Sequence, residues 1–147
     1  MKIAMGSDHG GFLLKESIKT YLSKQGYEII DMGTHNLDST DYPIYGRLAA
    51  EQVANGTCER GIVICSTGVG ISITANKVKG IRAALCTDVF TAKLTREHND
   101  ANVLALGQYV VGEMLAYSIV DIWLGTAFSD GERHIRRIAE IAEMEDN

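Results

Sequence analysis

A cysteine at the end of an apolar run opens directly onto a glycine-containing loop, in the stretch GIVICSTGVGISITANK (61–77). The pattern predicts a buried strand ending at Cys65, a turn containing Gly68 and Gly70, and then a helix. Glycines allow backbone N–H groups to approach a ligand, and the helix N-terminus adds partial positive charge, so the loop is suited to bind an anion. A thiol in such a place ionises readily and could remove a carbon-bound proton.

Other interpretations of this stretch are open. Cys65 could be a small core residue at the end of a buried strand. No Gly-Lys-Ser/Thr follows the glycines, which excludes a Walker loop, and Ile73 occupies the third glycine position of a dinucleotide-binding fingerprint. The other two cysteines, Cys58 and Cys86, lack a glycine loop and are predicted to be structural.

Two further groups could meet the same ligand. The motif GSDHGG places Asp8 and His9 just past the first predicted strand, although Asp8 could simply cap the next helix. Arg133 and Arg137 are four residues apart and therefore share one helix face, where a phosphate could accept hydrogen bonds from both guanidinium groups. The alternative for the arginines is a solvated basic face.

His98 lies in the stretch TREHNDANVLALG with Asn99, before a predicted strand rather than after one. These two residues are therefore expected at the edge of the sheet opposite the Cys65 loop. Either they are structural, or they reach the site of a neighbouring subunit, because twofold dimers are the commonest oligomers.

The whole chain alternates short apolar runs with segments of helical period. Strands are predicted at 2–6, 27–33, 61–65, 81–86 and 102–107, and helices near 11–25, 43–55, 70–79, 88–97, 110–124 and 131–145. Such alternation predicts an α/β fold with a parallel sheet and helices on both faces. In open sheets of this kind ligands bind beyond the carboxyl ends of the strands, where Cys65 and Asp8 are placed.

Length and composition narrow the class of protein. The 147 residues, 46% of them hydrophobic, predict a single globular domain (1–147). A net charge of −5 argues against nucleic-acid binding, and no apolar run is long enough to cross a membrane. The first residues do not form a signal peptide, and three cysteines without metal-ligand spacing favour a cytoplasmic protein with reduced thiols.

Taken in order, the motifs GSDHGG, STDYPIYG, ICSTGVGISITANK, GIRAALC, REHNDANVLALG and ERHIRR resemble the ribose-5-phosphate isomerase type B family, which also contains galactose- and allose-6-phosphate isomerases. The resemblance implies a Rossmann-like three-layer α/β/α sandwich with a five-stranded parallel sheet. It also implies a homodimer, in some members a tetramer, with active sites shared between subunits and the helix near 131–145 at the interface. No metal or organic cofactor is expected.

The resemblance also implies roles for individual residues. Cys65 is similar to the base that moves a proton between C1 and C2 of the open-chain sugar phosphate, and Thr67 with the amides of Gly68 to Gly70 to the site for the enediolate oxygen. His98 matches a residue that assists ring opening, with Asp8 opposite. The positions that match sugar or phosphate contacts are His9, Tyr42, Ser72, Asn99, Arg133 and Arg137.

Two residues depart from the family pattern. Ser66 stands where the family commonly has a glycine, and it could reshape the loop or add a donor to the intermediate. Tyr109 stands where several members have an arginine, so one phosphate contact is in question. The predicted reaction is the interconversion of ribose 5-phosphate and ribulose 5-phosphate; the alternatives are a hexose 6-phosphate isomerase and a phosphosugar-binding module without catalysis.

Overall fold

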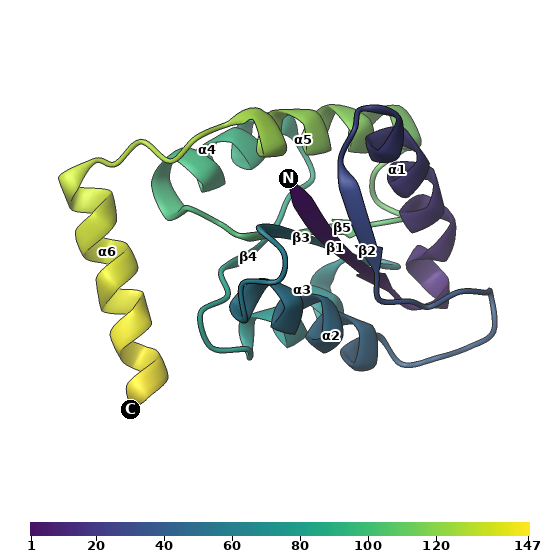
Figure 1. Cartoon of the computed structure of the whole chain (residues 1–147), viewed down its shortest axis with the longest axis horizontal. Coiled ribbons are helices and arrows are strands. Elements are labelled where there is room, and N and C mark those ends of the chain that lie inside the picture. The colour runs from purple at the N-terminus through teal and green to yellow at the C-terminus, as the bar shows by residue number, and fades with distance from the viewer.

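Five parallel strands form one sheet in the computed structural model, which describes residues 1–147 (Figure 1). All five lie where the sequence predicts strands, and the two edge strands are shorter than predicted because each pairs with a single neighbour. The order across the sheet is β2-β1-β3-β5-β4. The strands are β1 (Lys2–Ser7), β2 (Glu28–Asp31), β3 (Arg60–Cys65), β4 (Ala83–Leu85) and β5 (Val103–Gly107).

Helices cover both faces of the sheet, as predicted. In Figure 1, α1, α4 and α5 lie on one face and α2 and α3 on the other, while α6 stands at one side of the molecule. None of the helices combines enough residues with enough apolar character to span a bilayer. The helices are α1 (Phe12–Lys24), α2 (Tyr42–Ala54), α3 (Val69–Asn76), α4 (Val89–Asn99), α5 (Glu113–Gly125) and α6 (Glu132–Glu143), with short 3-10 turns η1 (His9–Gly11) and η2 (Met144–Asp146).

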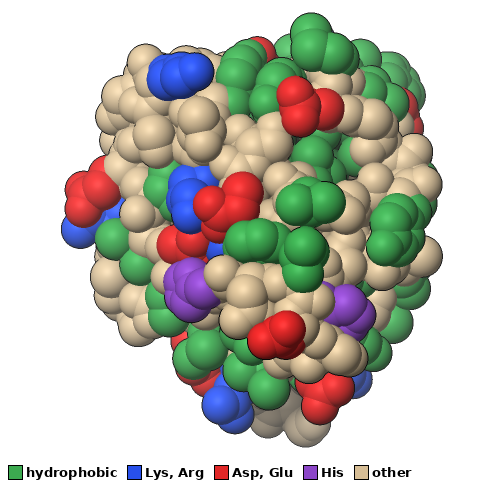
Figure 2. All heavy atoms as spheres, turned by 90° about the vertical axis from the view of Figure 1, so that its right-hand side faces the viewer, with side chains coloured by type: hydrophobic (Ala, Val, Ile, Leu, Met, Phe, Trp, Pro, Cys, Tyr) green, Lys and Arg blue, Asp and Glu red, His purple; other side chains and the backbone are tan.

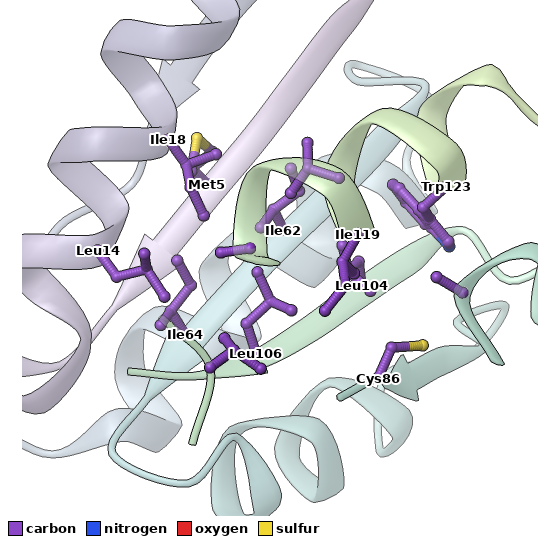
Figure 3. Packing of buried hydrophobic residues seen from close by; sticks show 14 of the residues in the cluster. Met5, Leu14, Ile18, Ile62, Ile64, Cys86, Leu104, Leu106, Ile119 and Trp123 are labelled. Atoms are coloured by element: carbon purple, nitrogen blue, oxygen red, sulfur yellow. The ribbon is translucent and has the colours of Figure 1, made fainter. Parts of the chain in front are cut away.

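The two faces of the sheet differ in the size of their side chains. Large residues such as Ile62, Ile64 and Leu106 point toward α1 and α5 and form the core drawn in Figure 3. Smaller residues on the other face, such as Ala4 and Val63, pack against α2 and α3. Successive residues of a strand point to opposite faces, so Cys65, two residues after Val63, also lies on the side of α2 and α3.

The strand order also fixes where a ligand can bind. From β1 the chain moves to β2 on one side of the sheet, and β3 then pairs with β1 on its other side. The connections that follow β1 and β3 therefore diverge and leave a crevice at the carboxyl ends of these strands. The three-layer α/β/α sandwich predicted from the sequence is confirmed, and its crevice lies between the Asp8 and Cys65 loops.

Candidate active site

A hollow of about 480 Å³ opens at the carboxyl end of β3. The structure brings together six of the residues that the sequence singled out, from the loop after β1, the start of α2, the end of β3 and the turn into α3. The walls of the hollow are completed by the side chains of Val69, of which the sequence had assigned only the amide, and of Ile73, which the sequence pattern did not assign to the site. The residues that line it are Asp8, Tyr42, Cys65, Ser66, Thr67, Val69, Gly70 and Ile73.

The Cys65 thiol lies at the wall of this hollow with 5% of the residue exposed. Its Sγ accepts a hydrogen bond from the backbone N–H of Gly68 at 3.1 Å. Gly68 has φ 78° and forms the N-cap of α3, a left-handed conformation that glycine adopts without strain. The tight turn therefore holds a backbone N–H group directly against the sulfur.

The first turn of α3 contains two unused hydrogen-bond donors. The N–H of Val69 donates to the Thr67 Oγ1 at 3.3 Å, but those of Gly70 and Ile71 donate to no group in the chain. Unpaired N–H groups at a helix N-terminus carry partial positive charge and attract an anionic oxygen. Gly70 lines the hollow, so its side of the turn can hold negative charge that develops on a ligand beside Cys65.

Asp8 has two functions in the structure. One carboxylate oxygen, Oδ1, accepts the N–H of Gly11 at 3.1 Å and caps the η1 turn, which is the structural role left open by the sequence. The residue also lines the hollow, although it is only 7% exposed. The capping bond holds the carboxylate in place at the edge of the ligand space.

His9 is tied to the loop that precedes α2. The Nδ1 atom of its imidazole accepts the backbone N–H of Thr40 at 3.2 Å. A nitrogen that accepts a hydrogen bond carries no proton, so the neutral ring has its proton on Nε2. His9 itself does not line the hollow, but its Nε2–H donates to no group of the chain and can donate to a phosphate oxygen.

Tyr42 begins α2 and lies directly over the glycine loop. A β-carbon added to Gly70 would come within 2.3 Å of the Tyr42 ring, so only glycine fits there. Ser72 does not line the hollow, and its hydroxyl donates to the carbonyl of Val69 at 2.7 Å within α3. Ile73 lies on the same face of α3 as Val69, and this spacing of four residues is the signal that would have placed both at the wall.

His98 lies at the far edge of the sheet, as the sequence indicates. It is near the end of α4, which leads into β5, and Val103 at the start of β5 pairs with Gly61 at the start of β3. Cys65 is four residues further along β3 than Gly61, so the two ends of this stretch of strand are about 13 Å apart. The His98 imidazole instead stacks on that of His134, with ring centroids 4.3 Å apart.

The other residues predicted to contact substrate are also outside the hollow. Arg133 and Arg137 are exposed on α6, and Asn99 lines a separate hollow beside Arg82. His134 is buried, and burial, together with the neighbouring His98 and the positive charges of Arg133 and Arg137, lowers the pKa of His134. Within one chain, the residues of the predicted site therefore form two separate groups.

The three cysteines differ in their surroundings. Cys65 borders a hollow, whereas Cys58 and Cys86 line none and are buried in the two cores. Burial raises the pKa of Cys58 and raises that of Cys86 to about 11. No three side chains among His, Cys, Asp and Glu gather as they would around a metal ion.

The chain is similar to known proteins over nearly its whole length. The model of the Ribose/Galactose Isomerase family matches residues 3–141. Ribose-5-phosphate isomerase B of Escherichia coli is 51% identical over 144 residues, covering 98% of this chain and 96% of the relative.

Two solved structures share the fold closely. Ribose-5-phosphate isomerase B of Clostridium thermocellum has a TM-score of 0.98 and 58% identity, over 99% of this chain and 98% of that one. Ribose-5-phosphate isomerase B of Mycoplasma genitalium, solved with bound ribulose-5-phosphate, has a TM-score of 0.94 and 40% identity, over 99% of this chain and 97% of that one.

Proposed function

This chain belongs to the Ribose/Galactose Isomerase family, and from that premise and the geometry of the Cys65 hollow we propose that it interconverts ribose 5-phosphate and ribulose 5-phosphate. The observation that carries the proposal is a thiol at the wall of a hollow, beside N–H groups that no other part of the chain uses. The relatives named for this reaction span nearly the whole chain.

The chemistry follows from these groups. The Cys65 thiolate removes the proton from C2 of the open-chain aldose, and the C2–H electrons form a double bond to C1 while the carbonyl π electrons move to O1. The free N–H of Gly70, at the start of α3, stabilises the resulting enediolate oxygen. A proton then moves from O2 to O1, the O2 electrons form the C2 carbonyl, and the electrons of the C1–C2 double bond take the proton back from the thiol at C1, which gives the ketose. A positioned base contributes a rate factor of about 10²–10⁴, and an oxyanion donor about 10²–10³.

The phosphate and the ring-opening step need groups that lie outside the hollow of the same chain. We assign the His9 Nε2–H, which donates to no group of the chain, to a phosphate oxygen. His98, Asn99, Arg133 and Arg137 fit the roles predicted for them when a second subunit presents them across a twofold axis. We therefore propose a homodimer in which each active site combines Cys65 of one subunit with His98 of the other.

Exposed apolar side chains support this arrangement. Ile73 at the wall of the hollow is 56% exposed, and Ile44 on α2 is 48% exposed. Ile135 and Ile141 on α6 are also exposed, at 50% and 44%. Figure 2 shows the side of the molecule opposite α6, where hydrophobic side chains are interspersed with acidic and basic ones. A second subunit that covers the four exposed isoleucines would exclude water from the reaction.

Three cysteines that form no disulfide suit the reducing cytoplasm, where we place the protein.

The substrate is tested by a kinetic screen of ribose 5-phosphate, allose 6-phosphate and galactose 6-phosphate, with ketose formation measured for each. We expect the highest kcat/KM with ribose 5-phosphate. A higher value with a hexose phosphate would assign the protein to the hexose branch of the family, and no turnover with any of them would leave only phosphosugar binding.

The shared site is tested by mixing two inactive variants, Cys65→Ala and His98→Asn. After subunits exchange, half of the dimers are mixed, and each mixed dimer carries one intact site and one doubly altered site. The mixture should therefore recover about a quarter of the wild-type activity. A mixture that stays inactive, although mass spectrometry detects mixed dimers, would contradict a site built from two subunits.

A further inference from the structure

The Ser66 hydroxyl is a polar group in the hollow that the chain itself does not use. Ser66 lies between Cys65 and Thr67 and lines the hollow with them. Its Oγ makes no hydrogen bond to any other group of the protein, whereas Thr67 Oγ1 accepts the N–H of Val69. The Ser66 O–H is therefore free to donate to a ligand.

Gly10 determines where this hydroxyl lies. A β-carbon added to Gly10 would come within 2.3 Å of the Ser66 Oγ and 3.3 Å of the Asp8 Oδ1. The serine oxygen thus occupies space that any larger residue at position 10 would fill, and Ser66 and Asp8 line the same hollow. Gly10 does not have positive φ, so its backbone does not require glycine, and the requirement arises from this contact.

The backbone of Ser66 is also held in place. Its carbonyl accepts the N–H of Tyr109 at 3.0 Å, and the carbonyl of Cys65 accepts the N–H of Gln108 at 2.9 Å. These two bonds extend the pairing of β3 with β5 beyond the strand ends. The loop therefore cannot turn to move the hydroxyl away from Cys65 without breaking them.

We propose that Ser66 is a further catalytic residue, whose hydroxyl donates a hydrogen bond to an enediolate oxygen, and that Gly10 is the positioning residue that gives it room. The inference rests on the proposed isomerase function and adds a donor beside the N–H groups of α3. The charge on the enediolate oxygen is larger in the intermediate than in the bound sugar. The bond therefore strengthens as the proton leaves C2, and its loss lowers kcat more than it changes KM.

The test compares Ser66→Ala with the wild-type enzyme on ribose 5-phosphate. A hydrogen bond to a charged group contributes a factor of about 10–100, so kcat should fall about tenfold or more while KM stays within about twofold. Affinity for a phosphorylated hydroxamate that mimics the enediolate should weaken by a similar factor. Affinity for ribulose 5-phosphate should change little. An unchanged kcat, or a change in KM alone, would overturn the proposal.

The role of Gly10 is tested with Gly10→Ala in both backgrounds. With Ser66 present, the added methyl group displaces the hydroxyl, and kcat should fall as far as in Ser66→Ala. In the Ser66→Ala background the same change should cost little further activity, because the contact at 2.3 Å is gone and only contacts at 3.3 Å, to the Asp8 Oδ1 and the backbone nitrogen of residue 66, remain. Equal losses in both backgrounds, in proteins whose melting temperatures match, would overturn the pairing. Since every comparison is with an active wild-type enzyme, failure of the isomerase assignment itself would show as an inactive wild type.

Discussion

Gly68→Ala tests whether the glycine loop is held as tightly as its geometry indicates. Gly68 has φ 78°, which costs about 1–2 kcal/mol for a residue with a β-carbon. The new β-carbon would also lie 2.5 Å from the Leu85 side chain and 2.8 Å from the backbone carbon of Leu106 in β5. The backbone of a central strand cannot easily move to make room, so overpacking lowers the stability by about a further 1–3 kcal/mol. The total of about 2–5 kcal/mol corresponds to a fall in Tm of about 10 °C for a chain of this length.

Two matched variants separate the causes. Gly80 has φ 85° but no atom within 4 Å of an added β-carbon, so Gly80→Ala should show the conformational cost alone, about 1–2 kcal/mol. Gly112 has negative φ and equally open surroundings, and Gly112→Ala should leave the Tm nearly unchanged. Calorimetry measures all three.

The Gly68→Ala change should also affect catalysis, because the Gly68 N–H donates to the Cys65 sulfur. A displacement of the loop by about 1 Å can lower turnover about 100-fold. Turnover is measured well below the Tm, so that the variant is folded. Equal losses of stability in Gly68→Ala and Gly80→Ala, with normal turnover in the former, would refute the reasoning.

Other predictions concern acid stability and thiol reactivity. Burial raises the pKa of Asp31, but hydrogen bonds from two lysines and a backbone N–H outweigh it and hold that pKa below its usual range. The stabilisation is therefore complete above the unfolded pKa of about 3.9 and is lost as the pH falls through the lower, folded value. Urea titrations from pH 2 to 7 should show a shallower acid dependence in Asp31→Asn than in wild type or the exposed-loop control Asp38→Asn, and equal slopes would exclude this role. Iodoacetamide on the native protein should label Cys65 before Cys58 or Cys86, since burial raises the pKa of both core thiols; peptide mass spectrometry showing a core thiol labelled first would contradict this.

Much of the fold follows from local pattern in the sequence. The apolar runs ending at Gly6 and Cys65 predict strands, and the rule that ligands bind beyond strand ends is enough to place Asp8 and Cys65 in one crevice. The insertion of β5 between β3 and β4 could not be predicted, because pairing order depends on packing between segments far apart in the chain. The contact of Gly10 with Ser66 depends on the same packing.

The site is predicted less completely than the fold. The position of His98 before a strand correctly indicates that it lies away from Cys65, but its stacking on His134 depends on the path of α6, which no local pattern specifies. The hydrogen bond from the Thr40 N–H to His9 could not be predicted either. It joins the segments that follow β1 and β2, which are neighbours only because these two strands pair. The roles of His98, Asn99, Arg133 and Arg137 depend on a second subunit and remain predictions.

The most direct test of Cys65 as the base is isotope exchange in heavy water. Wild-type enzyme incubated with ribose 5-phosphate in D₂O should place deuterium on C1 of the ribulose 5-phosphate that it forms, as measured by proton NMR. Cys65→Ala should bind ribulose 5-phosphate with nearly unchanged affinity in calorimetry, yet it should incorporate no deuterium. Incorporation by Cys65→Ala at a rate near that of the wild type would show that another group moves the proton.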